Sequence, residues 1–179
     1  MKVSSALLCF LVCTASSAAD SRALDGHGAD TRSTVNFPGF LREAADALTL
    51  RRTRLVDIDE FNAMAAENGT VILDTRSRDA FERRHLRGAL HLSLSDMTEE
   101  TLTRTLGSRD RRILIYCNNN FLNDPEAFAR KTPAAALNIP TYATLYIYDY
   151  RNVFELGSLL DVTDPRLSFE GTGPSMAQR

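Results

Sequence analysis

The chain has 179 residues, of which 44% are hydrophobic and 25% are charged, and its formal net charge at pH 7 is −2. These are ordinary values for a globular protein, and the length suits one domain with additional residues at its ends. A net charge this close to zero gives no reason to expect nucleic acid or an anionic membrane surface as a partner.

The N-terminus has the features of an export signal. Lys2 supplies a positive charge, residues 6–14 are apolar, and small residues precede a cleavage site near Ala19. The uncharged stretch is too short to span a bilayer. We therefore predict a signal peptide over residues 1–19 and a periplasmic or secreted protein with no membrane contact after signal removal. A buried N-terminal helix is the alternative.

Signal removal would leave a single cysteine in the chain. Cys9 and Cys13 lie in the predicted signal peptide, and Cys117 remains. An exported protein with one cysteine has no internal disulfide, so its thiol is either buried and inert or reactive.

The rest of the chain divides by its hydrophobic pattern. Residues 20–36 are polar and predict a flexible lead-in, whereas apolar residues recur at helical spacing in a predicted extension over residues 37–54. Short apolar strands then alternate with helices, which predicts βαβ units and a mainly parallel sheet flanked by helices. The predicted strands are residues 55–56, 71–74, 90–92, 112–117 and 153–156. Three of the predicted helices have a capping residue: one is capped by Asp57 or Asp59 and runs to residue 67, one spans residues 78–84 after Ser77, and one spans residues 99–106 after Thr98. Two more helices are predicted, one that starts at residue 124 and is ended by Pro133, and one over residues 140–150. Residues 85–89 are a predicted turn, and the tail over residues 158–179 shows no clear period.

The most informative stretch is the apolar run that ends in Cys117. A run without alternation suits a strand buried on both faces of a parallel sheet. Ligands bind at the carboxyl ends of such strands, so the thiol is placed to react with a molecule held by the following loop. Asn118, Asn119 and Asn120 offer neutral hydrogen-bond donors there, although a simple turn with solvated amides explains them equally well.

Three segments, in order, resemble the rhodanese-like domain family. The first is residues 71–77 with Phe81, His85, Gly88 and Ala89, the second is residues 112–117, and the third is residues 150–157. The resemblance covers residues 55–157 and implies a small doubly wound α/β domain. It also implies that the cysteine carries sulfane sulfur as a persulfide, from a donor such as thiosulfate to a thiophilic acceptor.

The loop departs from the pattern of active family members, which resembles Cys-x-x-Gly-x-Arg. Asn120 stands at the glycine position and Leu122 at the arginine position. Phosphatases of related fold need an arginine after a slightly longer loop, where this chain has Asn123. The predicted helix after the loop begins with Asp124 and Glu126, whose charges oppose the positive end of its dipole, so a weakly stabilised thiolate is expected.

These considerations define a candidate site and a ranked set of functions. Its members are Cys117 as the catalytic residue, Asn118, Asn119, Asn120, Phe121 and Leu122 as the substrate-binding loop, and Asp74, Arg76 and His85 as structural supports. Neither a cofactor nor a metal is expected, because His27, His85 and His91 lack the spacing of metal ligands. The expected partner is a small sulfur-containing anion or a thiol acceptor, with a protein partner as a further option.

Sulfur transfer is the first hypothesis for the function. Its rival is a catalytically weak or inactive module that binds an anion or a partner protein. A phosphatase ranks third, because no arginine stands where that chemistry needs charge stabilisation.

Overall fold

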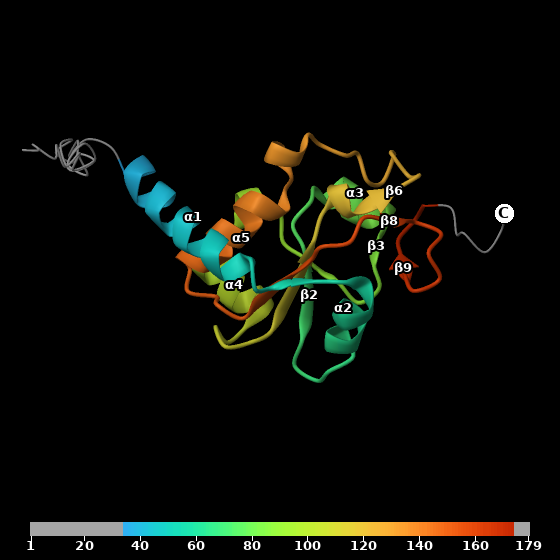
Figure 1. Ribbon diagram of the computed structural model, residues 1–179, viewed down its shortest axis with the longest axis horizontal. Coiled ribbons are helices and arrows are strands. Elements are labelled where there is room, and N and C mark those ends of the chain that lie inside the picture. The colour runs from blue at the N-terminus through green and yellow to red at the C-terminus, as the bar shows by residue number, and fades with distance from the viewer. Residues whose placement is uncertain (1–33, 174–179) are drawn as a thin grey trace, which may run out of the picture. The chain divides into compact units, whose positions relative to one another are not determined.

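The computed structural model describes residues 34–173 (Figure 1). The predicted signal peptide, most of the predicted lead-in and residues 174–179 lie outside the described residues. The chain divides into Met1–Pro38 and Gly39–Arg179, and the sheet and the candidate site belong to the second unit. The helices are α1 (Phe37–Arg51), α2 (Ile58–Ala65), α3 (Arg78–Arg83), α4 (Glu99–Leu106) and α5 (Asn138–Ile147), and the strands are β1 (Leu55–Val56), β2 (Val71–Asp74), β3 (His85–Leu86), β4 (Leu90–His91), β5 (Ile113–Tyr116), β6 (Phe121–Leu122), β7 (Val153–Leu156), β8 (Leu160–Asp161) and β9 (Phe169–Glu170).

The central feature is a five-stranded sheet with the strand order β1-β7-β5-β2-β4. Every pairing within it is parallel. β5 lies in the middle, where Leu114 is opposite Ile72 of β2 on one side and Phe154 of β7 on the other. The predicted α/β fold with a mainly parallel sheet is confirmed.

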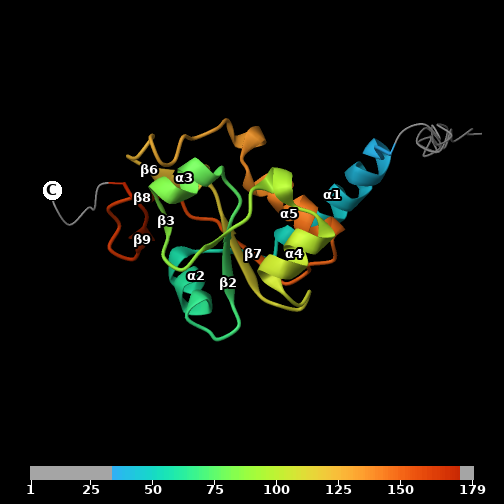
Figure 2. The same ribbon diagram turned by 180° about the vertical axis from the view of Figure 1, so that it is seen from behind.

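All four residues of β5 are buried, because helices cover both faces of the sheet. Successive strand side chains point to opposite faces, so Ile113 and Ile115 enter one hydrophobic core while Leu114 and Tyr116 enter the other. Figures 1 and 2 show α4 and α5 on one side of the sheet and α2 on the opposite side. Burying each large apolar side chain contributes about 1.5–3 kcal/mol relative to leaving it exposed.

Capping residues explain where three of the helices begin. Asp57 caps α2, Ser77 caps α3 and Thr98 caps α4, and each side-chain oxygen accepts a hydrogen bond from a backbone N–H of the first turn. Such a cap stabilises a helix by about 1 kcal/mol relative to alanine. Of the two aspartates considered for α2, Asp57 is the cap.

The prediction of a helix that begins at residue 124 is wrong. Asp124 does start a single turn, since its Oδ1 accepts from the backbone N–H of Ala127 at 3.1 Å and its carbonyl accepts from Phe128 at 2.8 Å. The turn does not continue, because Phe128 is buried in the core and the second Asp124 oxygen pairs with Arg84 at 2.6 Å. The next α-helix along the chain is α5, which begins at Asn138 and ends at Ile147 instead of spanning the predicted residues 140–150.

The C-terminal segment contains two short strands that its sequence pattern did not predict. β8 pairs in parallel with β6, and β9 pairs antiparallel with β3. The ring of Phe169 in β9 lies 5.5 Å from Phe121 and 5.6 Å from Phe128, measured between ring centroids. The predicted turn over residues 85–89 therefore includes a strand, and the tail packs against the domain.

Candidate active site

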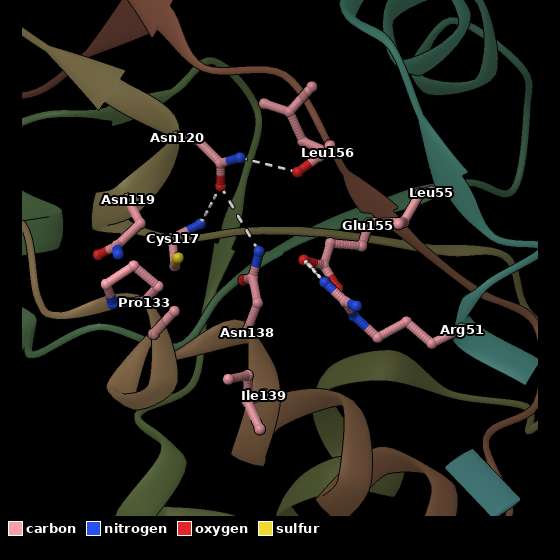
Figure 3. Close-up of a pocket in the computed structure, with 12 residues that line it drawn as sticks. Arg51, Leu55, Cys117, Asn119, Asn120, Pro133, Asn138, Ile139, Glu155 and Leu156 are labelled. Carbon is pink, nitrogen blue, oxygen red and sulfur yellow. Dashed lines mark hydrogen bonds and ion pairs between the residues drawn. The ribbon is translucent and has the colours of Figure 1, made fainter. Parts of the chain in front are cut away.

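Cys117 lies directly after β5, at the carboxyl end of the central strand. The residue is 2% exposed, and it lines a cavity of about 270 Å³ (Figure 3). The other walls come from the end of α1, from β1, from residues 133–139 and from the end of β7. The thiol is therefore buried in the protein but borders a space that can hold a small molecule.

The strand order places the carboxyl end of β5 near the middle of the sheet. The chain passes from β2 to β4 on one side of β2, and then from β5 to β7 in the opposite direction. In open α/β sheets ligands bind at the carboxyl ends of the strands, and this cavity lies at that end of β5, on the side that faces β7 and β1.

Asn120 holds the loop that follows Cys117. Its Oδ1 accepts from the backbone N–H of Cys117 at 2.8 Å, and its Nδ2 donates to the carbonyls of Leu156 at 2.7 Å and Ser158 at 3.0 Å. The loop is thereby attached to the end of β7 by a buried side chain, at the position where the family pattern has glycine.

The other two loop asparagines also bind main-chain groups. Asn118 Nδ2 donates to the carbonyl of Ala129 at 2.6 Å, and Asn119 Nδ2 donates to the carbonyl of Lys131 at 2.7 Å. Asn119 and Asn120 line the cavity, whereas Asn118 does not. At least one N–H of each amide thus holds the loop in place and is not directed at a ligand.

Phe121 and Leu122 lie away from the cavity. Phe121 is 1% exposed, and its ring packs against Tyr116, Phe128 and Phe169. Leu122 is part of β6 and pairs with Asp161 of β8. The chain turns away from Cys117 immediately after Asn120, so a cation at position 122 would not face the thiol along this backbone path.

The surroundings of the Cys117 sulfur act on its pKa in opposite directions. Burial raises the pKa of the thiol above its ordinary value, and the carboxylate of Glu155 raises it further. Hydrogen bonds from the backbone N–H groups of Asn119, Asn138 and Leu137 to the sulfur oppose this rise without cancelling it. The helix start beside the thiol is thus that of α5, rather than the acidic one expected at residue 124.

An ion pair between Arg51 and Glu155 lines the same cavity and was missed by the sequence reasoning. Arg51 Nε lies 2.5 Å from Glu155 Oε2, and Arg51 Nη2 lies 2.7 Å from Oε1. The hydrogen bond with Glu155 raises the pKa of the guanidinium. One signal could have drawn attention to Glu155, because a carboxylate inside an apolar strand needs a cationic partner.

Asn138, at the start of α5, is a second cavity residue that the sequence did not single out. It is 3% exposed, and its Nδ2 lies 3.5 Å from Asn120 Oδ1. Because the Asn120 amide is oriented by three main-chain hydrogen bonds, Asn138 must direct its amino group toward it. Among the described residues, Asn138 Oδ1 has no hydrogen-bond partner, which leaves a buried acceptor at the cavity.

Asp74 and Arg76 form a buried ion pair outside the cavity. Arg76 Nη2 lies 2.6 Å from Asp74 Oδ2, and the Tyr116 hydroxyl donates to the same oxygen at 2.5 Å. Arg76 also donates to the carbonyls of Arg84 at 2.6 Å and Ala127 at 2.8 Å. Burial lowers the pKa of Arg76, but its bonds to Asp74 outweigh this and leave the pKa raised. The pair thus connects the end of β2 to two neighbouring loops.

His85 lies in β3 and does not line the cavity. Its ring stacks on Phe81 with 3.7 Å between the centroids, and Nδ1 lies 2.7 Å from the Phe81 carbonyl oxygen. These contacts are structural.

Within residues 34–173, no group of three His, Cys, Asp or Glu side chains is arranged to hold a metal ion. No helix in that part of the chain is long and apolar enough to cross a membrane. The cavity brings together one thiol, nearby main-chain N–H groups that lower its pKa, and a charged pair.

The fold and the site define a small α/β domain that places a cysteine at the carboxyl end of its central parallel strand. The family model of the rhodanese-like domain matches residues 57–155. The chain belongs to the rhodanese-like domain family, as the three ordered segments of its sequence indicated.

Several solved structures are similar to this chain. The Alr3790 protein from Anabaena sp. is 20% identical over 69% of this chain and 97% of its own, with a TM-score of 0.45. The BH2092 protein from Bacillus halodurans is 20% identical over 65% of this chain and 74% of its own, with a TM-score of 0.42. Protein hp1203 from Helicobacter pylori 26695 is 18% identical over 61% of this chain and 81% of its own, with a TM-score of 0.38. No curated protein matches the chain.

Proposed function

We propose that the protein is a sulfurtransferase in which Cys117 carries sulfane sulfur as a persulfide. The observation that carries this proposal is the position of the thiol. It borders a cavity at the carboxyl end of β5, where the nearby backbone N–H groups of Asn119, Leu137 and Asn138 lower the pKa of the thiol against the effect of burial. Fixed main-chain dipoles of this kind stabilise negative charge on a sulfur atom without reorganising during the reaction.

The proposed first half-reaction loads the cysteine with sulfur. The thiol releases its proton to solvent, and the thiolate attacks the outer sulfur of a donor such as thiosulfate. A bond forms between Cys117 Sγ and that sulfur, while the sulfur–sulfur bond of thiosulfate breaks and its electron pair leaves with sulfite. The backbone N–H groups of Asn119, Leu137 and Asn138 support the charge on the attacking sulfur.

The second half-reaction returns the enzyme to its starting state. A thiolate of the acceptor attacks the outer sulfur of the persulfide, and the bond between that sulfur and Sγ breaks. The electron pair of this bond returns to Cys117 as a thiolate, and the acceptor leaves as a persulfide. The cycle needs no oxidant or reductant beyond the donor and the acceptor.

Mass spectrometry of the full chain after incubation with thiosulfate tests the proposal. We expect one added sulfur on the peptide that contains Cys117, together with release of sulfite. Cys117→Ser should gain no sulfur while keeping the circular dichroism spectrum of the wild type. If several donors add no sulfur to a protein whose thiol still reacts with alkylating agents, sulfur transfer is ruled out and the rival hypothesis of a binding module takes its place.

A further inference from the structure

The loop after Cys117 lacks the arginine of the family pattern, but a different element brings a guanidinium to the cavity. Arg51 is the last residue of α1 and precedes the matched stretch of residues 57–155. Figure 3 shows its side chain entering the cavity from the side of Glu155, with Asn138 and Cys117 beyond it. The cation that the loop does not provide is therefore present from another part of the fold.

One edge of this guanidinium is free to bind a ligand. Glu155 occupies Nε and Nη2, whereas Nη1 has no hydrogen-bond partner among the described residues. The Arg51 side chain is 26% exposed, and the Glu155 side chain is 6% exposed. A guanidinium has five N–H donors, so those that remain can bind an anionic group in a forked geometry.

Two further observations concern the surroundings of this guanidinium. Arg51, Glu155 and Cys117 line the same cavity, and the Glu155 carboxylate raises the pKa of the thiol. The orphan Oδ1 of Asn138 shows that this cavity contains a buried polar group without a protein partner. A buried acceptor of this kind is normally satisfied by water or by a hydrogen-bond donor, so it marks space in the cavity for water or a donor group rather than for the anionic end of a ligand.

The size and rim of the cavity limit what can bind. Its 270 Å³ corresponds to about nine water molecules at roughly 30 Å³ each. This volume suits a small molecule rather than a segment of a partner protein. Leu55 and Ile139 contribute apolar walls. Among the side chains that line the cavity, Arg51 and Glu155 are the charged ones, so Arg51 is the side-chain cation available to an anionic ligand.

We propose that Arg51 is the specificity-determining residue of the site, and that its free edge binds the anionic end of a small sulfur donor such as thiosulfate. Glu155 holds the guanidinium in position and weakens the attraction for a second anion. This inference rests on the proposed function, because it names the residue that would select the donor. A purely structural role, in which the pair only attaches α1 to β7, is the competing explanation.

Calorimetric titration of thiosulfate into full-length Cys117→Ser separates the two explanations, because this variant binds without reacting. Adding Arg51→Gln should raise the Kd by roughly ten- to a hundredfold, the usual effect of losing a charge-assisted hydrogen bond. Adding Glu155→Gln should lower the Kd, since the guanidinium loses its competing carboxylate. Arg52→Gln is the matched control, because it removes the same charge from an exposed neighbour that does not line the cavity, and it should leave the Kd unchanged.

Arg51→Gln leaves Glu155 buried without its partner, so this variant can fail to fold. The double change Arg51→Gln with Glu155→Gln replaces the ion pair by a neutral hydrogen-bonding pair, and its thermal unfolding can be compared directly with that of the parent. If the folded double variant binds thiosulfate as tightly as the Cys117→Ser parent, or if the parent binds none, the proposal is overturned.

The outcomes also separate this inference from the proposed function. Binding that depends on Arg51 in Cys117→Ser, together with no persulfide in the wild type, would support the anion site and refute sulfur transfer. Persulfide formation in the wild type, together with a Kd for thiosulfate that does not change when Arg51 is replaced, would support sulfur transfer and refute this role of Arg51.

Discussion

Cys117 has a thiol whose ionisation is opposed by burial and by Glu155 and is favoured by backbone N–H groups. Burial dominates, so the pKa of the thiol is raised. The nucleophile in sulfur chemistry is the thiolate, which forms only as the pH approaches the pKa. A raised pKa therefore means that only a small fraction of the protein is reactive at neutral pH.

The rate of alkylation of Cys117 should accordingly rise with pH and level off only above the pKa of an ordinary thiol. Below its pKa the thiolate fraction increases about tenfold for each pH unit. Reaction of the full chain with iodoacetamide, followed by quantification of the peptide that contains Cys117, measures this profile. Glu155→Gln should move the midpoint to lower pH, because a negative charge near the sulfur is removed. A wild-type midpoint below that of free cysteine would contradict the prediction.

Arg76 should be the residue at which loss of a charge is most damaging to stability. Arg76→Met would leave Asp74, which is fully buried, without its cation, and this should lower the free energy of unfolding by about 3–5 kcal/mol. Arg78→Met is the matched control, because Arg78 pairs with Glu82 at 3.7 Å on the surface and its loss should cost no more than about 0.5 kcal/mol. Urea unfolding of both variants measures the difference, and equal effects would contradict the assigned role of Arg76.

At the scale of elements, β5 is the strand whose burial on both faces organises the domain. Leu114→Asp would place a carboxylate in the core, since Leu114 is 0% exposed and its neighbours in the core cluster are apolar or aromatic. We expect the free energy of unfolding to fall by roughly 3 kcal/mol or more. The same change at Leu90, which is 41% exposed on the edge strand β4, is the control and should cost much less. Comparable thermal unfolding of the two variants would show that β5 is not the central buried strand.

The elements outside the family match contribute directly to the site and to the fold. α1 buries Ala47 and brings Arg51 to Glu155, so this helix is attached to the sheet by an ion pair as well as by packing. At the other end, β9 places Phe169 beside the aromatic rings of the core. The folded unit therefore extends beyond residues 57–155 in both directions.

For the molecule as a whole, we propose that it is exported and loses its N-terminal segment. The apolar stretch and the small residues before Asp20 have the order of a cleavable signal. N-terminal sequencing of protein from the exported fraction should show a first residue near Ala19 or Asp20. Recovery of the chain in the cytoplasm with Met1 still present would contradict the prediction.

The sequence by itself determined the class of fold, the family and the position of the thiol. Apolar runs, helical periodicity and caps such as Asp57, Ser77 and Thr98 depend on residues close together in the chain, so they can be recognised without a structure. The position of Cys117 followed for the same reason, because a buried strand and its end are local features.

Only the tertiary structure decided how the surroundings of that thiol are built. The segment after residue 124 has a helix cap but no helix, because Arg84 and the aromatic core hold it in a single turn. The cation of the cavity comes from Arg51, which is 104 residues away from Glu155 along the chain. A local pattern shows that a buried carboxylate needs a partner, but only the packing of α1 against the sheet determines which arginine reaches it.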